Sequence, residues 1–150
     1  MREAVLGQPD AVVVPGGGWM NRAAEGSWTQ AERGVLPAKL ATLAPSVEFL
    51  ASVCTGSMLL ATAGLLTGRC ATTNRGALEQ LRGYGVEVLD ERVVDDGTIM
   101  TAGGLTAGID LGLWIVEREQ GTVAADRRAH AVEYVRPGTV WRSGRTGGSV

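Results

Sequence analysis

Cys54 is the residue whose type and position point most directly to chemistry. It follows an apolar, strand-like run and precedes a helix-like run within residues 49–64, so the sequence places a thiol on a sharp strand-to-helix turn. The amides that open a helix carry partial positive charge, which favours the thiolate, the nucleophilic form of cysteine. Ser52 and Gly56 lie two residues to either side and are small enough for strand and helix to approach closely, as in the nucleophile elbow of hydrolases. The sequence therefore predicts that Cys54 is a nucleophile.

A structural role is the alternative for each of the two cysteines. Cysteine behaves as a small hydrophobe and is often simply buried, so apolar surroundings alone would favour a packing role for Cys54. The order of strand, Cys54, Thr55, Gly56 and helix instead favours the nucleophile. Cys70 falls in a predicted strand with no helix start beside it, and we interpret it as structural.

The length and the charge of the chain limit the number of domains and the kinds of partner that we expect. The chain has 150 residues, enough for one compact core, so we expect a single domain over residues 1–150 with a flexible Ser-, Gly- and Arg-rich tail at 142–150. The 14 basic and 16 acidic residues nearly balance, and no Lys/Arg run with interleaved aromatic residues is present. Because such runs are what tracks a phosphate backbone, we expect no nucleic-acid partner.

The apolar runs and the metal-ligating residues indicate the cellular location of the protein and whether it binds a metal. No apolar stretch reaches the roughly 20 residues of a membrane span, and the first residues lack the apolar region of a signal peptide. We therefore expect a cytoplasmic protein with no membrane partner. Two cysteines and one histidine, without Cys-x-x-Cys or His-x-x-x-His spacing, indicate that no metal is bound. We expect no cofactor.

The pattern of apolar runs and turn residues predicts alternating strands and helices. Short apolar runs bounded by Gly, Pro or Asp predict strands at residues 10–14, 47–53, 69–73, 86–89, 92–94 and 98–101. Helical spacing predicts helices at residues 36–44, 55–66, 74–82, 106–119 and 123–135. We expect residues 19–34 to be irregular and residues 95–97 to form a hairpin turn. This alternation predicts an α/β fold, with a mostly parallel sheet and helices on both faces.

Three predicted strand ends meet at one edge of this sheet. They are the glycine loop at residues 16–18, the turn at Cys54 and the turn at residues 101–104. Ligands of such sheets bind beyond the carboxyl ends of the strands, so we expect the site there. The glycine loop lacks the spacing and the lysine of nucleotide-binding loops, which favours a loop that supplies backbone amides. Trp19 and Trp28 follow it and are candidates for lining a pocket or a dimer contact.

Four segments in this order resemble the ThiJ/PfpI superfamily, within the class I glutamine amidotransferase-like, flavodoxin-like fold. They are residues 9–18, 51–57, 63–73 and 94–114, and the resemblance covers most of the chain from Pro9 to Arg142. The Cys-Thr-Gly sequence at residues 54–56 is similar to the branch that contains the isonitrile hydratases. The fold that the resemblance implies agrees with the fold that the pattern predicts.

The resemblance implies a cysteine-dependent reaction at a small electrophilic carbon, such as the hydration of an isonitrile to an N-substituted formamide. In that reaction Cys54 attacks as the thiolate and Thr55 assists. The backbone amides of Gly16 or Gly17 stabilise developing negative charge, which is where fixed donors are most effective. The expected partner is a small-molecule substrate.

The N-terminus departs from the family pattern. Family members place a β-α-β unit, with a Glu or Asp beside the cysteine, before the glycine loop, whereas eight residues precede Pro9 here. We therefore expect an N-terminally truncated version of the fold, explained by a start assigned too late, by a natural truncation or by cover from a partner chain. The apolar surface that this would expose predicts a homodimer.

A second departure concerns histidine. Many relatives carry a histidine after a Thr-Thr pair, where this sequence has Asn74. The single histidine, His130, falls in the last predicted helix and suits a surface or structural role. Asn74 and Asp110 are minor site candidates, although the sequence favours a helix cap or a solvated position for Asp110 over a catalytic role.

Two functions from different classes remain open. The first is an isonitrile hydratase-like enzyme. The second is a catalytically weak or inactive module that binds a ligand or senses oxidants through the same thiol. The missing acid and histidine favour this second function, because general acid–base assistance contributes about 10²–10⁴-fold to a rate.

Overall fold

The computed structural model describes residues 8–138 and 140–144 of the chain. The strands are β1 (Ala11–Val14), β2 (Phe49–Val53), β3 (Cys70–Ala71), β4 (Glu87–Val88), β5 (Val93–Asp95), β6 (Ile99–Ala102) and β7 (Trp141–Arg142). The α-helices are α1 (Ser27–Arg33), α2 (Val35–Leu43), α3 (Gly56–Thr62), α4 (Leu78–Arg82), α5 (Ala107–Gln120) and α6 (Thr122–Ala131). Two 3₁₀ turns are also present, η1 (Ala44–Ser46) and η2 (Arg75–Ala77).

Five strands form the main sheet, in the order β1-β2-β6-β5-β7. β1 pairs with β2, β2 with β6 and β5 with β7 in parallel, whereas the β5–β6 hairpin is antiparallel. β3 and β4 form a separate parallel pair. The predicted α/β fold with a mostly parallel sheet is therefore confirmed.

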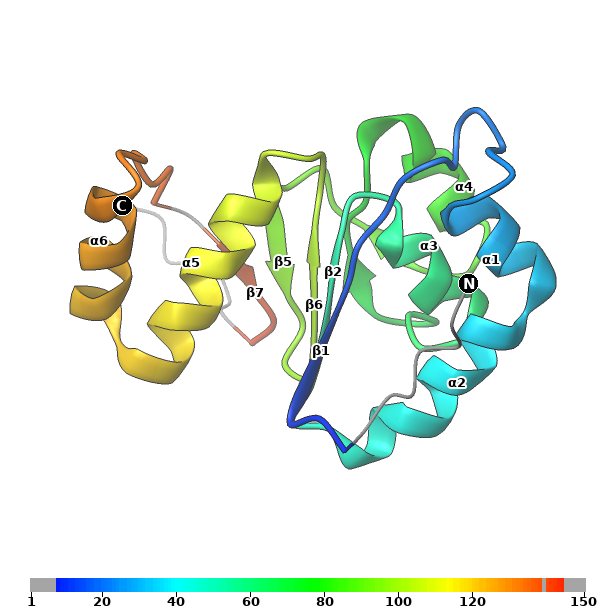
Figure 1. Cartoon of the computed structure of the whole chain (residues 1–150), viewed down its shortest axis with the longest axis horizontal. Helices are drawn as coiled ribbons and strands as arrows, with labels where there is room; N and C mark the ends of the chain where they lie inside the picture. Colours follow the sequence, from blue (N-terminus) through cyan, green and yellow to red (C-terminus); the bar gives the residue numbers. More distant parts are fainter. Residues whose placement is uncertain (1–7, 139, 145–150) are drawn as a thin grey trace.

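Helices cover both faces of the main sheet, as the sequence predicts (Figure 1). α1 to α4 lie on one side, and α5 lies on the other with α6 packed on its outer face. Side chains alternate along a strand, so β2 contributes to both cores. Leu50 is clustered with Met58 of α3, whereas Phe49 is clustered with Leu111 of α5. Because both faces are buried, β2 is apolar almost throughout instead of alternating with polar residues.

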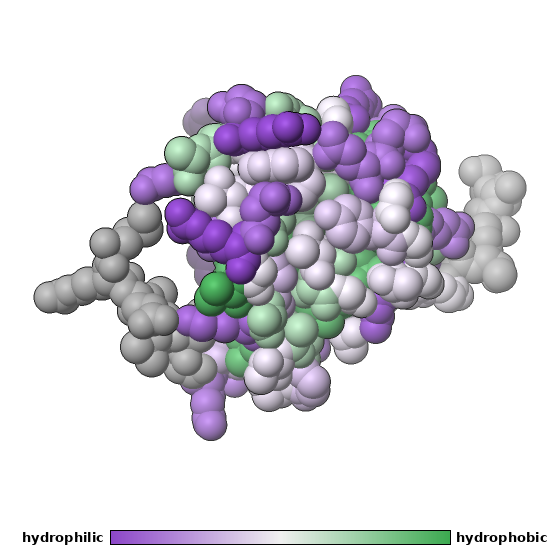
Figure 2. All heavy atoms as spheres, turned by 90° about the vertical axis from the view of Figure 1, so that its right-hand side faces the viewer, coloured by the Kyte–Doolittle hydropathy of each residue, from purple (hydrophilic) through white to green (hydrophobic). Residues whose placement is uncertain are grey.

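Figure 2 turns the side of α1–α4 towards the viewer. Polar and apolar residues are interspersed there, with hydrophilic residues gathered in the upper part of the view. The inner positions of the same helices are apolar, as Leu40 of α2 shows by its burial in the core. These helices therefore separate a mixed outer surface from the core that supports the end of β2.

The segment 19–34 is not irregular throughout, contrary to the sequence expectation, because it contains α1. Gly34 ends this helix in a left-handed conformation (φ 69°), and its N–H donates to the carbonyl oxygens of Gln30 and Ala31. A helix of seven residues is unstable in isolation. Contacts with α2 and α3 stabilise α1, and local sequence does not report such contacts.

Several further sequence boundaries differ from the structure. α3 ends at Thr62 and α6 at Ala131, each four residues before the predicted end. Residues 74–82 are predicted as one helix, but the segment opens with the 3₁₀ turn η2, and α4 begins at Leu78. Asp95 is predicted to lie in the hairpin turn, yet it is the last residue of β5 and accepts the Gly97 N–H at 2.9 Å. The hairpin itself is confirmed.

Arg142 is predicted to open a flexible tail, but it belongs to β7. It pairs with Asp95 of β5, and the next residue, Ser143, donates its N–H to the Asp95 carbonyl oxygen at 3.0 Å. The Arg142 guanidinium carbon lies 5.2 Å from the ring centroid of Trp114, which adds a cation–π contact. Residues 145–150 of the predicted tail lie outside the described residues.

Candidate active site

Cys54 lies between the end of β2 and the start of α3, on the predicted turn. Its φ of 56° is in the left-handed region, which costs a residue with a side chain about 1–3 kcal/mol. Its N–H is shared between the carbonyl oxygens of Ala102 (3.0 Å) and Gly103 (2.8 Å), at the end of β6. The neighbouring strand therefore holds the strained backbone of Cys54 in place.

Two hydroxyl groups hold the carbonyl oxygen of Cys54. Thr73 Oγ1 donates to it at 2.9 Å and Ser57 Oγ at 3.3 Å. The Ser57 hydroxyl in turn lies 2.8 Å from the buried Ser52 hydroxyl. Because the N–H and the C=O of Cys54 are both fixed, the backbone sets the direction in which its thiol points.

Two glycines allow the glycine loop to lie directly against the turn. A Cβ atom on Gly16 would lie 2.4 Å from the Thr55 nitrogen and 2.6 Å from the Gly56 nitrogen. A Cβ atom on Gly56 would lie 2.1 Å from the carbonyl oxygen of Val14. The close approach expected at Gly56 is therefore present, and it brings the loop backbone against the first amides of α3.

The buried Thr55 hydroxyl joins three segments at this contact. Its Oγ1 accepts the Gly17 N–H at 2.9 Å and lies 2.9 Å from Oγ of Ser27, the first residue of α1. Ser27 Oγ also donates to the Gly17 carbonyl oxygen at 2.8 Å. Thr55 thus positions the glycine loop, and its direct assistance in a reaction stays a prediction.

A pocket of about 170 Å³ opens beside the half-buried Cys54 thiol. It is lined by Gly17, Gly18, Trp19, Met20, Asn21, Cys54, Thr55 and Asn74. Trp19 is one of its apolar walls and packs edge-on against Trp28, with 5.1 Å between ring centroids. The Trp19 indole N–H donates to Gln80, which fixes the ring. The arrangement exposes the Cys54 sulfur to a space that suits a small molecule.

Comparison with known proteins identifies the relatives of this chain. The sequence profile of the DJ-1/PfpI family matches residues 1–118. The chain belongs to the DJ-1/PfpI family. It is 34% identical over 125 residues to an isonitrile hydratase of Pseudomonas putida, a match that covers 83% of this chain and 52% of that protein. The family resemblance that the sequence motifs predict is confirmed.

Solved structures of DJ-1/PfpI relatives share the fold. A ThiJ/PfpI family protein from Pseudomonas syringae superposes with a TM-score of 0.75 at 30% identity, covering 87% of this chain and 52% of its own. Schizosaccharomyces pombe DJ-1 superposes with a TM-score of 0.69 at 21% identity, covering 85% and 64% respectively. The chain spans about half the length of the isonitrile hydratase and of the Pseudomonas syringae protein.

Asn74 lies beside the Cys54 pocket and stays a site candidate. Its Oδ1 accepts the Gly76 N–H at 3.0 Å and so caps η2. Its Nδ2 lies 3.8 Å from the Cβ position of Gly104, in the turn after β6. Since Oδ1 is fixed by the cap, Asn74 presents the donor end of its amide to the carboxyl edge of the sheet.

The structure does not bring Asp110 together with Cys54. Asp110 is buried in the first turn of α5, where its Oδ2 accepts Arg92 Nε at 2.7 Å and Nη2 at 2.5 Å. Its Oδ1 accepts the Tyr134 hydroxyl at 2.8 Å. Hydrogen bonding to Asp110 raises the pKa of both Arg92 and Tyr134. Asp110 is therefore neither a solvated residue nor a cap, and it ties the start of α5 to two other segments.

Replacing Asp110 by asparagine should lower the free energy of unfolding by about 1–3 kcal/mol, because Arg92 and Tyr134 lose a charged acceptor. Urea denaturation measures this loss. Asp126→Asn is the matched control, since Asp126 is exposed in its pair with Arg136 and should contribute less than about 0.5 kcal/mol. The alkylation rate of Cys54 should stay unchanged, and a large fall in that rate would place Asp110 in the site after all.

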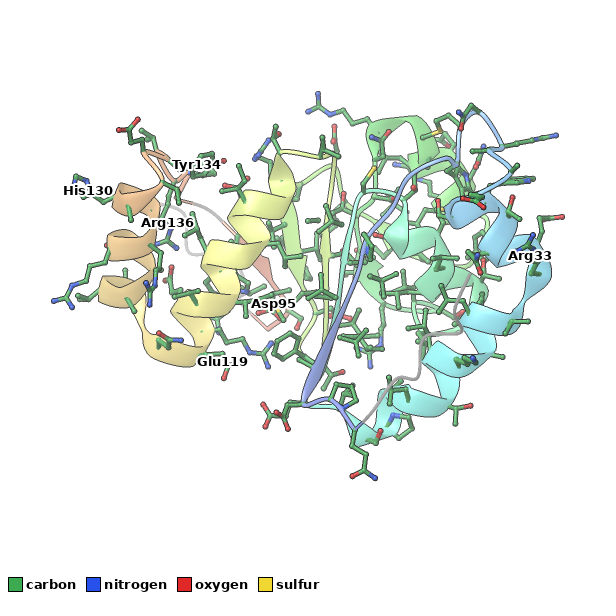
Figure 3. The ribbon with its side chains drawn as sticks, viewed as in Figure 1. Arg33, Asp95, Glu119, His130, Tyr134 and Arg136 are labelled. Atoms are coloured by element: carbon green, nitrogen blue, oxygen red, sulfur yellow. The ribbon has the colours of Figure 1, made fainter. Side chains whose placement is uncertain are left out.

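Histidine and carboxylate groups lie away from the Cys54 pocket. His130 is on α6, across the sheet from α3, and its side chain points outwards (Figure 3). Among the described residues, those that line the pocket include no carboxylate and no imidazole. Within this part of the chain, a proton donor or acceptor for the thiol would therefore have to be water, a backbone group or a neutral side chain of the lining, such as Thr55 or Asn74.

Cys70 lies in β3, opposite Glu87 of β4. Burial, and then the hydrogen bond and negative charge of Glu87, raise the pKa of the Cys70 thiol to about 11. Near neutral pH this cysteine is almost entirely protonated and unreactive. The environment of Cys70 agrees with the structural role that the sequence indicates.

Limiting iodoacetamide should alkylate Cys54 well before Cys70. With a pKa of about 11, only about one thousandth of Cys70 is thiolate at pH 8, and its labelling should rise about tenfold per pH unit up to that pKa. Peptide mass spectrometry after alkylation from pH 7 to 10 measures both rates. Equal labelling of the two cysteines at pH 7 would contradict the special position of Cys54.

Two general features are absent from the described residues. Residues 8–138 and 140–144 contain no helix long and apolar enough to cross a membrane. The same residues contain no group of three or more His, Cys, Asp or Glu side chains arranged to hold a metal ion.

The sequence analysis missed two residues that shape the site. Ser27 lies in the segment predicted to be irregular, where it is the first residue of α1 and Gly26 is the N-cap. Thr73 is one of the two hydroxyl donors to the Cys54 carbonyl oxygen, and it lies in the segment after β3, a strand that does not pair with β2. No local signal in the sequence indicates that long-range bond.

Proposed function

We propose that this DJ-1/PfpI protein uses Cys54 as a nucleophile to hydrate a small isonitrile. The observation that carries the proposal is the strained, doubly anchored backbone of Cys54 beside an open pocket. Strain of this kind persists only where the surrounding structure enforces it, and it is concentrated at functional sites. The 34% identity to an isonitrile hydratase supports the choice of substrate class.

The proposed reaction has two steps. First, the Cys54 sulfur bonds to the terminal carbon of R–N≡C and that carbon takes up a proton, which gives the thioimidate R–N=CH–S–Cys54. Water then adds to the same carbon, nitrogen takes up a proton, and the carbon–sulfur bond breaks as the thiol is restored. The sum is R–NC plus water giving R–NH–CHO, with no oxidant or reductant consumed.

Backbone amides of the glycine loop are the proposed source of charge stabilisation. Gly16 lies directly over the start of α3, and Gly17 belongs to the pocket lining. The Gly17 N–H donates to Thr55 Oγ1 in this structure, so its use by an oxyanion would require that bond to be exchanged. A preorganised donor of this type contributes about 10²–10³-fold to a rate.

A ligand-binding or redox-sensing module is the alternative function. The pocket composition favours it, because the described lining residues offer neither carboxylate nor imidazole to move protons. In that case Cys54 would react with an electrophile or oxidant once and would not turn over.

Incubation of the chain with small alkyl isonitriles tests the two functions against each other. We expect NMR to detect the N-substituted formamide in amounts exceeding the protein concentration. A stable adduct on Cys54 without released formamide, detected by intact mass, would support the module and contradict the hydratase.

Self-association is a further part of the proposal and remains a prediction. It is supported by β1, which is an edge strand of the main sheet, and by Val13 within it, which is 52% exposed. Edge strands with exposed apolar residues tend to be covered by another chain.

A further inference from the structure

A second pocket opens at the same edge of the sheet as the Cys54 pocket. Its volume is about 280 Å³, and Asn74 belongs to the lining of both pockets. Thr73 and Gly103 also line it, and these are the residues that hold the C=O and the N–H of Cys54. The two pockets therefore adjoin at Asn74, next to the groups that hold the Cys54 backbone.

Arg92 is the anchored charge of the second pocket. Its Nε and Nη2 are both held by the buried Asp110, and Nη2 also lies 3.4 Å from Thr106 Oγ1. Those bonds leave Nη1 as the donor atom of the guanidinium that they do not use. Arg92 lines the pocket and Asp110 does not, so the member of this ion pair that borders the pocket is the positive one.

Other groups add donors to this pocket. Asn74 presents Nδ2, because its Oδ1 is fixed by the Gly76 N–H. Thr106 and Ala107 mark the start of the 14-residue helix α5, whose N-terminal end carries partial positive charge.

Two acidic residues, Asp90 and Glu91, also line this pocket, and both are exposed. Asp90 is 63% exposed and pairs with Arg75, which is 86% exposed, at 3.3 Å. Exposed pairs of this kind are weak and are screened by solvent and salt. Arg92 is the less exposed of the two lining arginines, at 45%, and it is the one held by a buried partner.

We propose that this second pocket binds a carboxylate carried by the substrate, with Arg92 and Asn74 as its donors. The inference rests on the proposed function, since it assigns the remote end of the molecule whose electrophilic carbon reaches Cys54. The preferred substrates are then isonitriles with a carboxylate a short distance from the reacting carbon.

Titration of the ¹⁵N-labelled chain with N-formylglycine and with its methyl ester tests this proposal without any turnover. N-formylglycine is the product that hydration of isocyanoacetate would give. We expect the acid to bind at least about tenfold more tightly than the ester, because only the acid can form a charge-assisted bond with Arg92. The largest shifts should appear at the Asn74 side-chain amide and at Gly103 and Gly104.

Three variants sharpen the test. Arg92→Gln should abolish the preference for the acid, and Arg82→Gln, an exposed arginine of α4, should leave it unchanged. Asp90→Asn removes a rim carboxylate and should strengthen binding of the acid about two- to threefold. This exposed substitution keeps the proposal testable if Arg92→Gln does not fold.

Equal affinity for acid and ester, a preference retained in Arg92→Gln or no gain in Asp90→Asn would overturn the carboxylate site. Equal kcat/KM for isocyanoacetate and its methyl ester would also overturn it while leaving the hydratase intact. A clear preference for the acid in a chain that hydrates no isonitrile would support the pocket and contradict only the proposed reaction.

Discussion

Cys54→Ser should reduce isonitrile hydration by about 10³-fold or more. Serine keeps the shape of the side chain and the bonds of the backbone, but its hydroxyl is a far weaker nucleophile, and the described residues that line the pocket include no carboxylate or imidazole to activate it. Formamide production followed by NMR gives kcat for both proteins. The loss should appear in kcat, because the pocket that binds the substrate is unchanged.

Cys70→Ser is the matched control for this experiment. It makes the same chemical change at a cysteine of β3 and should leave kcat within about twofold. Circular dichroism should confirm that both variants are folded. Retention of most of the activity in Cys54→Ser would remove Cys54 from the mechanism, whatever the fold of the variant.

Gly56→Ala should be among the most damaging single-atom changes in the chain. The added Cβ would lie 2.1 Å from the Val14 carbonyl oxygen, a rigid backbone atom at the end of β1. Either α3 or the glycine loop must then move, and overpacking of this type typically costs about 1–3 kcal/mol. We expect a loss of at least about 2 kcal/mol in urea denaturation, together with slower alkylation of Cys54 as the turn shifts.

Gly112→Ala should raise the free energy of unfolding, and it is the control for Gly56→Ala. Gly112 lies within α5, and apart from its chain neighbours and the backbone of its own helix no atom of the described residues lies within 4 Å of its Cβ position. Alanine there should stabilise the protein by about 0.5–1 kcal/mol, because it lowers the entropy lost on folding. A comparable loss of stability in both variants would mean that the close approach at Gly56 is not the cause.

The sequence indicated the turn at Cys54 because its signals are local. All of them lie within residues 49–64. They are an apolar run typical of a buried strand, a small residue on either side of the cysteine and a helical pattern after it. The same kind of local pattern predicted the α/β class and the β5–β6 hairpin, both of which are confirmed. Trp19 was also a correct candidate for the pocket wall, because it directly follows the glycine loop.

Other parts of the fold depend on contacts between distant segments. α1 is stabilised by its packing on α2 and α3, and β7 by pairing with β5 and by the contact of Arg142 with Trp114. Neither element has a strong pattern of its own, so propensity alone does not predict it. The role of Asp110 also depends on distant segments, because its partners Arg92 and Tyr134 are 18 and 24 residues away in the chain.

By itself the sequence determined that a cysteine ends a buried strand at the carboxyl edge of a parallel sheet, since strand, turn and helix are encoded by neighbouring residues. The tertiary structure alone decided how that cysteine is held and what lies around it. Both depend on segments that meet only after the sheet has formed. These segments make the hydrogen bonds of Cys54 with Ala102, Gly103 and Thr73, and they form the second pocket with Arg92. Hydrogen bonds and pockets depend on positions in space, and residue order constrains those positions only through the fold.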